Sequence, residues 1–96
     1  MYTLNFKEQF VKAVKKQIKG NQVLETKLKK TLIQLAQDPN YNSLNSHKVD
    51  TVDQIDVWSS WITGDLRIIW NYSQDKIEVI DVITIGGHSG GKKVYK

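Results

Sequence analysis

The spacing of apolar and polar side chains predicts a strand followed by a helix at the start of the chain. Residues 2–6 alternate apolar and polar side chains, which is the period of a half-buried strand. Over residues 6–19 the apolar positions recur every fourth residue while lysines take the other faces, as in an amphipathic helix. Asn5, with Glu8 three residues later, predicts a capped start, and Gly20 predicts a left-handed helix exit.

A second amphipathic helix is predicted directly after this glycine. Asn21 is a suitable N-cap, and Pro39 disfavours helical geometry at the residue before it, so the helix should end near Gln37. Residues 38–46 form a polar loop of turn-forming residues. The apolar stripe that needs a partner consists of Leu24, Leu28, Leu32, Leu35 and Ala36.

The second half of the chain predicts strands to cover this stripe. Runs of β-branched and aromatic residues at 55–63, 66–72 and 77–85 are separated by the turns Gly64–Asp65 and 73–76. The predicted fold is α+β, with an N-terminal strand and an antiparallel helical hairpin packed on one face of a four-stranded, mainly antiparallel sheet.

Length and composition restrict the class of protein. The 96 residues predict one domain over 1–96, and the absence of cysteine excludes a disulfide scaffold and a cysteine-ligated zinc site. No apolar run approaches the roughly 18 residues of a membrane span. The apolar N-terminal stretch is too short for a signal peptide, so we expect a cytoplasmic protein.

Charge is distributed unevenly along the chain. The formal net charge of +4 arises from +6 in residues 1–37, −5 in residues 38–81 and +3 in residues 82–96. Basic ends of this kind suggest a surface that faces a polyanion. Of the fourteen basic residues only Arg67 is an arginine, which singles out that position.

Arg67 lies in a predicted strand with its side chain on the less apolar face. Alternation places Arg67 and Asn71 opposite the larger apolar set, which the helices should cover. A guanidinium on the uncovered face can hold a phosphate through two hydrogen bonds. The alternative is a surface cation paired with one of the aspartates.

Two histidines are candidates for proton transfer. His88 lies among glycines after the last predicted strand, where the backbone can bring an imidazole close to a ligand. His47 precedes the sheet. The alternative for each is an ordinary loop histidine, and their spacing from carboxylates does not indicate a metal site.

The C-terminal residues combine a ring with cations. Tyr95 offers stacking on a base, and Lys92, Lys93 and Lys96 offer charge for phosphates, as in single-stranded RNA recognition. The alternative is a basic tail without a ligand. The three tryptophans, Trp58, Trp61 and Trp70, are expected to pack in the core or at the sheet edge. The helix lysines are expected to form a solvated surface.

Three stretches carry a resemblance to a known family. They are Trp58-Ser-Ser-Trp-Ile-Thr-Gly-Asp-Leu-Arg-Ile-Ile-Trp70, Ile85-Gly-Gly-His88 and the closing Val94-Tyr95. With the order strand, helical hairpin and antiparallel sheet, the chain resembles the RelE/ParE toxin superfamily, and in particular its RelE/YafQ-like messenger-RNA interferases.

The resemblance implies a function and roles for residues. It implies a toxin that cleaves ribosome-bound messenger RNA without a metal or other cofactor and is neutralised by a cognate antitoxin protein. On this resemblance, Arg67 matches the arginine that stabilises the five-coordinate phosphate, and His88 matches a general acid or base. Tyr95 matches the C-terminal aromatic residue that positions the substrate. His47 is the candidate complement of His88. Further RNA contacts are expected at Lys48, Asn71, Lys92 and Lys93.

Two other functions fit the same resemblance. A ParE-like toxin inhibits DNA gyrase by protein contact without catalysis, and a third possibility is a relative that only binds RNA. Fold alone does not separate them. A histidine at 88 together with the arginine at 67 favours the nuclease.

Overall fold

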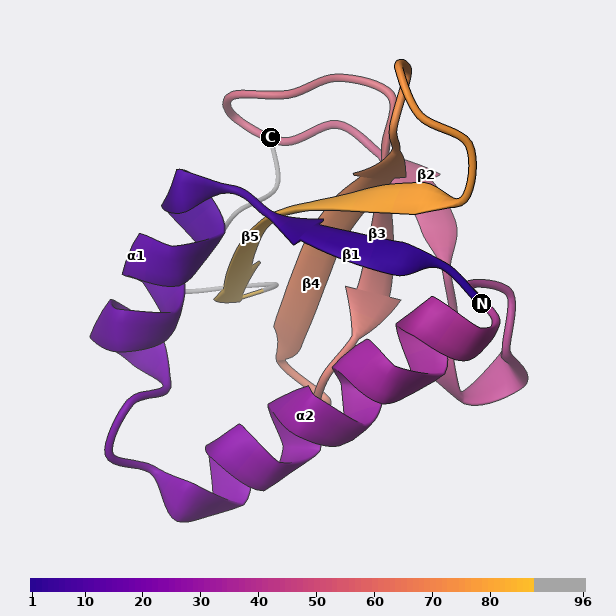
Figure 1. The fold of residues 1–96 in the computed structure, drawn as a ribbon. Coiled ribbons are helices and arrows are strands. Elements are labelled where there is room, and N and C mark those ends of the chain that lie inside the picture. Colours follow the sequence, from indigo (N-terminus) through magenta and orange to yellow (C-terminus); the bar gives the residue numbers. More distant parts are fainter. Residues whose placement is uncertain (88–96) are drawn as a thin grey trace.

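The computed structural model describes residues 1–87 and shows two helices packed against a sheet (Figure 1). In chain order the elements are β1 (Thr3–Phe6), α1 (Glu8–Gln17), α2 (Gln22–Gln37), the 3-10 helix η1 (Asn42–Leu44), β2 (His47–Val49), β3 (Val57–Trp61), β4 (Leu66–Tyr72) and β5 (Val79–Gly87). Within residues 1–87, no helix is both long enough and apolar enough to cross a membrane.

The strands form one five-stranded sheet in the order β1-β5-β4-β3-β2. β1 pairs with β5 in parallel, and all other neighbours are antiparallel. The predicted α+β class is therefore confirmed, but the predicted number of four strands is one too low. The additional strand, β2, has only three residues and follows the polar loop, and an alternation of that length does not stand out from a loop in the sequence.

The helix ends show which capping predictions hold. Gly20 has a φ of +89°, and the Asn21 side chain accepts a hydrogen bond from a backbone N–H of the first turn of α2, both as predicted. The predicted Asn5 cap of α1 is wrong, because the N-cap is Lys7, which makes no side-chain cap bond. Asn5 belongs to β1 instead, and its amide donates to the Asp81 carboxylate at 2.9 Å.

Two strands begin later than predicted. Ile55 and Ile77 were expected in strands but lie outside them, 72% and 93% exposed. The residues that follow them, Asp56 and Glu78, have φ angles of +56° and +60°. A left-handed residue interrupts an extended strand, so β3 and β5 begin only after these positions.

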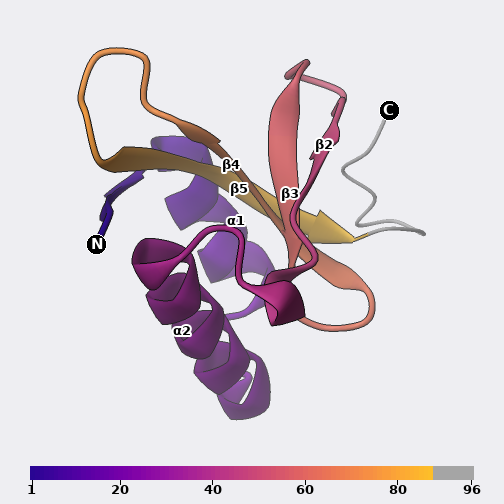
Figure 2. The ribbon, with the colours of Figure 1, turned by 90° about the vertical axis from the view of Figure 1, so that its right-hand side faces the viewer.

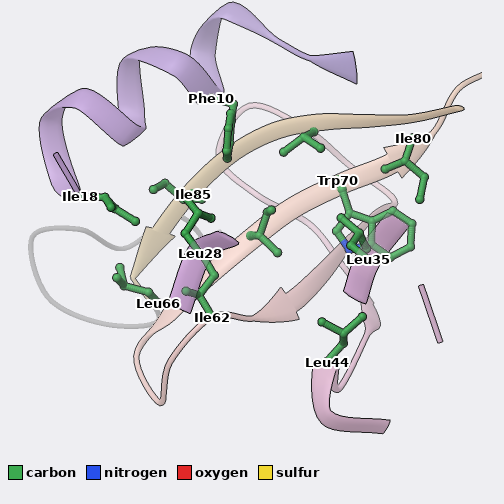
Figure 3. Close-up of a cluster of buried hydrophobic side chains, with 12 residues drawn as sticks. Phe10, Ile18, Leu28, Leu35, Leu44, Ile62, Leu66, Trp70, Ile80 and Ile85 are labelled. Atoms are coloured by element: carbon green, nitrogen blue, oxygen red, sulfur yellow. The ribbon is translucent and has the colours of Figure 1, made fainter. Parts of the chain in front are cut away.

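Both helices cover the same face of the sheet (Figure 2). From the Gly20 turn they run in different directions, α1 beside β5 and α2 across the ends of β3 and β4 (Figure 1). Trp70 of β4 is fully buried beneath them, among side chains from both helices, η1, β4, β5 and the β3–β4 turn (Figure 3). The cluster comprises Phe10, Ile18, Leu28, Leu35, Leu44, Ile62, Leu66, Ile68, Trp70, Ile80, Val82 and Ile85.

Candidate functional site

The sheet face opposite the helices carries Arg67, as the sequence predicted. In the β3–β4 pair Arg67 lies opposite Trp61, and in the β4–β5 pair it lies opposite Gly86. Directly paired residues point to the same face, so Trp61 shares the face of Arg67. We call this side of the sheet the Arg67 face; its positions in the three central strands include Ser59, Trp61, Arg67, Ile69 and Thr84.

Backbone carbonyls and an aromatic ring hold the Arg67 side chain. Its Nη1 donates to the carbonyl of Thr63 at 2.8 Å and to that of Leu66 at 3.3 Å. Its Cζ lies 4.8 Å from the centre of the Trp61 ring, within the range of a cation–π interaction. Arg67 is 6% exposed and has no carboxylate within 4.0 Å among the described residues. Within residues 1–87, Arg67 is therefore not a surface cation paired with an aspartate, which was the alternative interpretation from the sequence.

The β3–β4 hairpin fixes this position. The Thr63 hydroxyl accepts from the backbone N–H groups of Asp65 and Leu66, and Ile62 N–H donates to the carbonyl of Leu66. The turn is therefore centred on Gly64. A two-residue turn at Gly64–Asp65, as predicted from the sequence, places a different residue of β3 opposite Arg67.

His47 lies on the same face of the sheet, two strands away. It pairs with Ser59 at the edge strand β2, and its side chain is exposed. Strand spacings place its Cα about 12 Å from that of Arg67. Its Nδ1 lies 2.9 Å from the carbonyl oxygen of Asn45, which only accepts, so Nδ1 carries the hydrogen. In the neutral ring Nε2 then has the free lone pair and can accept a proton.

A chain of hydrogen bonds that begins in the core supports the start of β2. The indole N–H of Trp70 donates to the Ser60 hydroxyl at 2.8 Å, and the Ser60 and Ser46 hydroxyls lie 2.7 Å apart. Ser46 donates to the carbonyl of Pro39 at 2.7 Å. Because His47 follows Ser46 directly, this chain ties the position of the histidine backbone to the core.

The other two predicted sites within residues 1–87 lie apart from Arg67. Lys48 pairs with Trp58 on the opposite side of the sheet, where its ammonium is 5.3 Å from the ring centre and 3.2 Å from the Asp56 carboxylate. Asn71 is on the Arg67 face but four residues further along β4, a separation of about 13 Å. The structure thus brings Arg67 and His47 to one side and Lys48 to the other.

Four predicted site residues fall outside the described part of the chain: His88, Lys92, Lys93 and Tyr95. Gly87 is the last described residue, and it pairs with Leu66, which precedes Arg67 in β4.

Trp61 is the residue that the sequence reasoning missed. It was expected to be a packing tryptophan, yet it is 43% exposed and contacts Arg67, whereas Trp70 is fully buried. The glycine at position 64 could have revealed this contact, because a hairpin turn centred on Gly64 pairs positions 61 and 67.

Two clefts flank the site and differ in charge. The larger, about 450 Å³, lies at the far end of the Arg67 face and includes Lys7 with the two carboxylates Asp75 and Asp81. The smaller, about 360 Å³, lies between α2 and the β3–β4 hairpin and includes Trp61 with two lysines. Within residues 1–87 no cluster of three histidine or acidic side chains could hold a metal ion.

No family model and no curated protein matches the chain by sequence. Solved structures match over most of it. The YoeB/ParE toxin from Agrobacterium tumefaciens is 16% identical with a TM-score of 0.70, covering 91% of this chain and 99% of its own. A metal-bound toxin from Helicobacter pylori is 20% identical with a TM-score of 0.71, covering 92% and 96%.

A chain of the archaeal RelE–RelB complex from Pyrococcus horikoshii OT3 is 19% identical with a TM-score of 0.65, covering 88% of this chain and 91% of its own. At identities of 20% or less, these likenesses concern the fold. The fold is that of the RelE/ParE toxins, as the sequence resemblance implied.

Proposed function

We propose that this protein is the toxin of a type II toxin–antitoxin pair and cleaves ribosome-bound messenger RNA. The observation that carries the proposal is the arginine held on the sheet face opposite the helices, against an exposed tryptophan and without a carboxylate partner among residues 1–87. The fold, shared with RelE and YoeB toxins, supports it.

In the proposed reaction a ribose 2′-hydroxyl attacks the adjacent phosphate. A base removes the hydroxyl proton, the bond from phosphorus to the 5′-oxygen breaks, and an acid protonates that oxygen as a 2′,3′-cyclic phosphate forms. Both hydrogen bonds of Arg67 use Nη1, and its Nε and Nη2 carry further donors that suit the charged phosphate of the transition state.

The proton-transfer roles go to the histidines. His47 presents Nε2 as a lone pair when neutral, which suits a general base, and His88 is its proposed complement as general acid. Tyr95 is proposed to position the substrate, with Lys92 and Lys93 binding phosphates and Asn71 contacting RNA further along the face. Lys48 is not included, because its ammonium pairs with Asp56 on the opposite side.

Charge supports a polyanionic target. Eight lysines against two acids in residues 1–37 place positive charge around the two helices. Such a surface attracts ribosomal RNA over distances of a Debye length. The same charge suits a short acidic antitoxin, and the similar structures include toxin–antitoxin complexes.

The proposal is tested in a translating cell-free extract by mapping new messenger-RNA 5′ ends. Arg67→Ala should lower the cleavage rate about 100- to 1,000-fold, because one lost donor to a developing charge has about that effect. Lys76→Ala, an exposed charge change far from the site, is the matched control. Thermal melts of both variants check the fold. Absence of new ends with the wild-type protein, together with inhibited gyrase supercoiling, would favour the ParE-like alternative.

A further inference from the structure

The cleft between α2 and the β3–β4 hairpin has the chemistry of a nucleotide site. We call it the α2 cleft; it measures about 360 Å³ and is lined by Lys27, Lys30, Thr31, Gln34, Ser43, Trp61, Ile62, Thr63 and Gly64. A cleft of this volume is within the range of small-ligand pockets. None of these lining residues is acidic, so the charge of the cleft is positive.

One helical face supplies the charged wall. Lys30 and Thr31 follow Lys27 by three and four residues and precede Gln34 by four and three, so these residues lie along one side of α2. Both lysines are exposed and free to reach an anion, and neither has a carboxylate within 4.0 Å among residues 1–87. The Ser43 hydroxyl donates to the Gln34 amide oxygen at 3.1 Å, which orients that amide at the cleft wall.

Trp61 lines the α2 cleft and also contacts Arg67. Its ring carries the Arg67 guanidinium at 4.8 Å, and the residue remains 43% exposed. Thr63, which accepts the Arg67 hydrogen bond through its carbonyl, also lines the cleft. The α2 cleft therefore adjoins two residues, Trp61 and Thr63, that contact the proposed catalytic arginine.

We propose that the α2 cleft binds a nucleotide of single-stranded RNA adjacent to the phosphate at Arg67, with its base on Trp61 and its phosphate at Lys27 and Lys30. An exposed ring beside cations is the combination that single-stranded RNA sites use. The larger cleft fits this role less well, because the carboxylates of Asp75 and Asp81 repel a phosphate. The inference rests on the proposed function for the identity of its ligand.

The test measures binding of a fluorescein-labelled 2′-O-methyl oligonucleotide, which the proposed reaction cannot cleave, by anisotropy at several salt concentrations. Lys27→Gln/Lys30→Gln should weaken binding and reduce the slope of log K against log salt by about 1.4, since each phosphate contact on a single strand contributes about 0.7. Lys15→Gln/Lys29→Gln removes the same charge from exposed helix positions outside the cleft and should retain the wild-type slope.

Replacement of the ring tests the stacking. Trp61→Ala should weaken oligonucleotide binding about 5- to 150-fold, the effect of losing one base–aromatic stack, while Trp61→Phe should retain most of the affinity. Equal slopes for the two lysine pairs, or unchanged binding by Trp61→Ala, would overturn the inference.

Two comparisons distinguish RNA binding in the α2 cleft from binding of an acidic protein and from failure of the proposed function. If hexaglutamate binds as tightly as the oligonucleotide and with the same dependence on Trp61, the occupant is an acidic protein segment and the inference is wrong. The oligonucleotide assay requires no cleavage, so a wild-type protein that binds through the α2 cleft but leaves messenger RNA intact contradicts the proposed function alone. Cleavage that depends on Arg67 but not on the α2 cleft contradicts only the inference.

Discussion

The two sides of the β3–β4 pair use tryptophan in opposite ways. On the helix-covered side Trp70 is fully buried, stacks on Trp58 with ring centres 5.6 Å apart, and donates its indole N–H to Ser60. On the Arg67 face Trp61 is 43% exposed and its ring contacts a guanidinium. The same pair of strands thus places one tryptophan ring in the hydrophobic core and another at the candidate functional site.

The difference shows how this small fold separates stability from chemistry. Burial of a large ring with its polar atom paired contributes to folding, whereas a half-exposed ring contributes little and remains free for a ligand. The sheet lets both occur together, because successive side chains point to opposite faces. Substitutions on the two sides should therefore affect different measurements.

The largest expected effect is the loss of the buried ring. Trp70→Ala should lower the free energy of unfolding by about 3–5 kcal/mol, since a large cavity replaces the ring. Trp61→Ala should lower it less, by about 1–2 kcal/mol, because the ring is 43% exposed although the Arg67 side chain that it contacts is buried. Urea denaturation of both variants measures the contrast, and similar losses for the two would show that Trp61 is a core residue after all.

A smaller effect is expected at the hydroxyl that serves Trp70. Ser60→Ala leaves the buried indole N–H without its acceptor and removes the contact with Ser46, at a cost of about 1–3 kcal/mol. Ser43→Ala, whose hydroxyl bonds to Gln34 at an exposed position, should stay within about 0.5 kcal/mol of wild type. Chemical denaturation distinguishes the two; equal stabilities would mean that another acceptor replaces Ser60.

The smallest effect is a pH dependence on the helix-covered side. Burial raises the pKa of the Tyr72 phenol above its usual value, and Tyr2 and Asp38 raise it further. The folded state therefore holds this proton more tightly than the unfolded state. The resulting stability is complete below about pH 10 and is lost as the pH rises through the folded pKa.

Denaturation of wild type and Tyr72→Phe at pH 8 and above pH 10 measures this difference. The stability of wild type should fall relative to that of Tyr72→Phe over this interval. A parallel decline in both proteins would assign the alkaline loss to other groups.

Local sequence patterns predicted which helices and strands form better than they predicted where each one begins. The Asn21 cap and the Gly20 exit were predictable because each depends on a few neighbouring residues. The Asn5 cap was wrong because a residue distant in sequence, Asp81, binds the Asn5 amide in the folded sheet. The third long strand was likewise predicted two residues early, since Glu78 takes a left-handed conformation that the apolar run does not reveal.

The candidate site was predictable in part for the same reason. Strand alternation was enough to place Arg67 and Asn71 on the face opposite the helices. Alternation did not reveal β2, so the shared face of His47 and the separate side of Lys48 emerged only from its pairing with β3. The roles assigned to His88 and Tyr95 remain predictions from sequence.

By itself, the sequence determined the helices, the long strands and the face of its single arginine, because these depend on periods of two or about four residues along the chain. Tertiary structure decided that Trp61 lies beside Arg67 and that Lys27 and Lys30 of α2 line the same cleft as Trp61. Those neighbours depend on the centre of one turn and on where a helix crosses the end of a sheet. Both are set by packing between segments far apart in sequence, which no local period encodes.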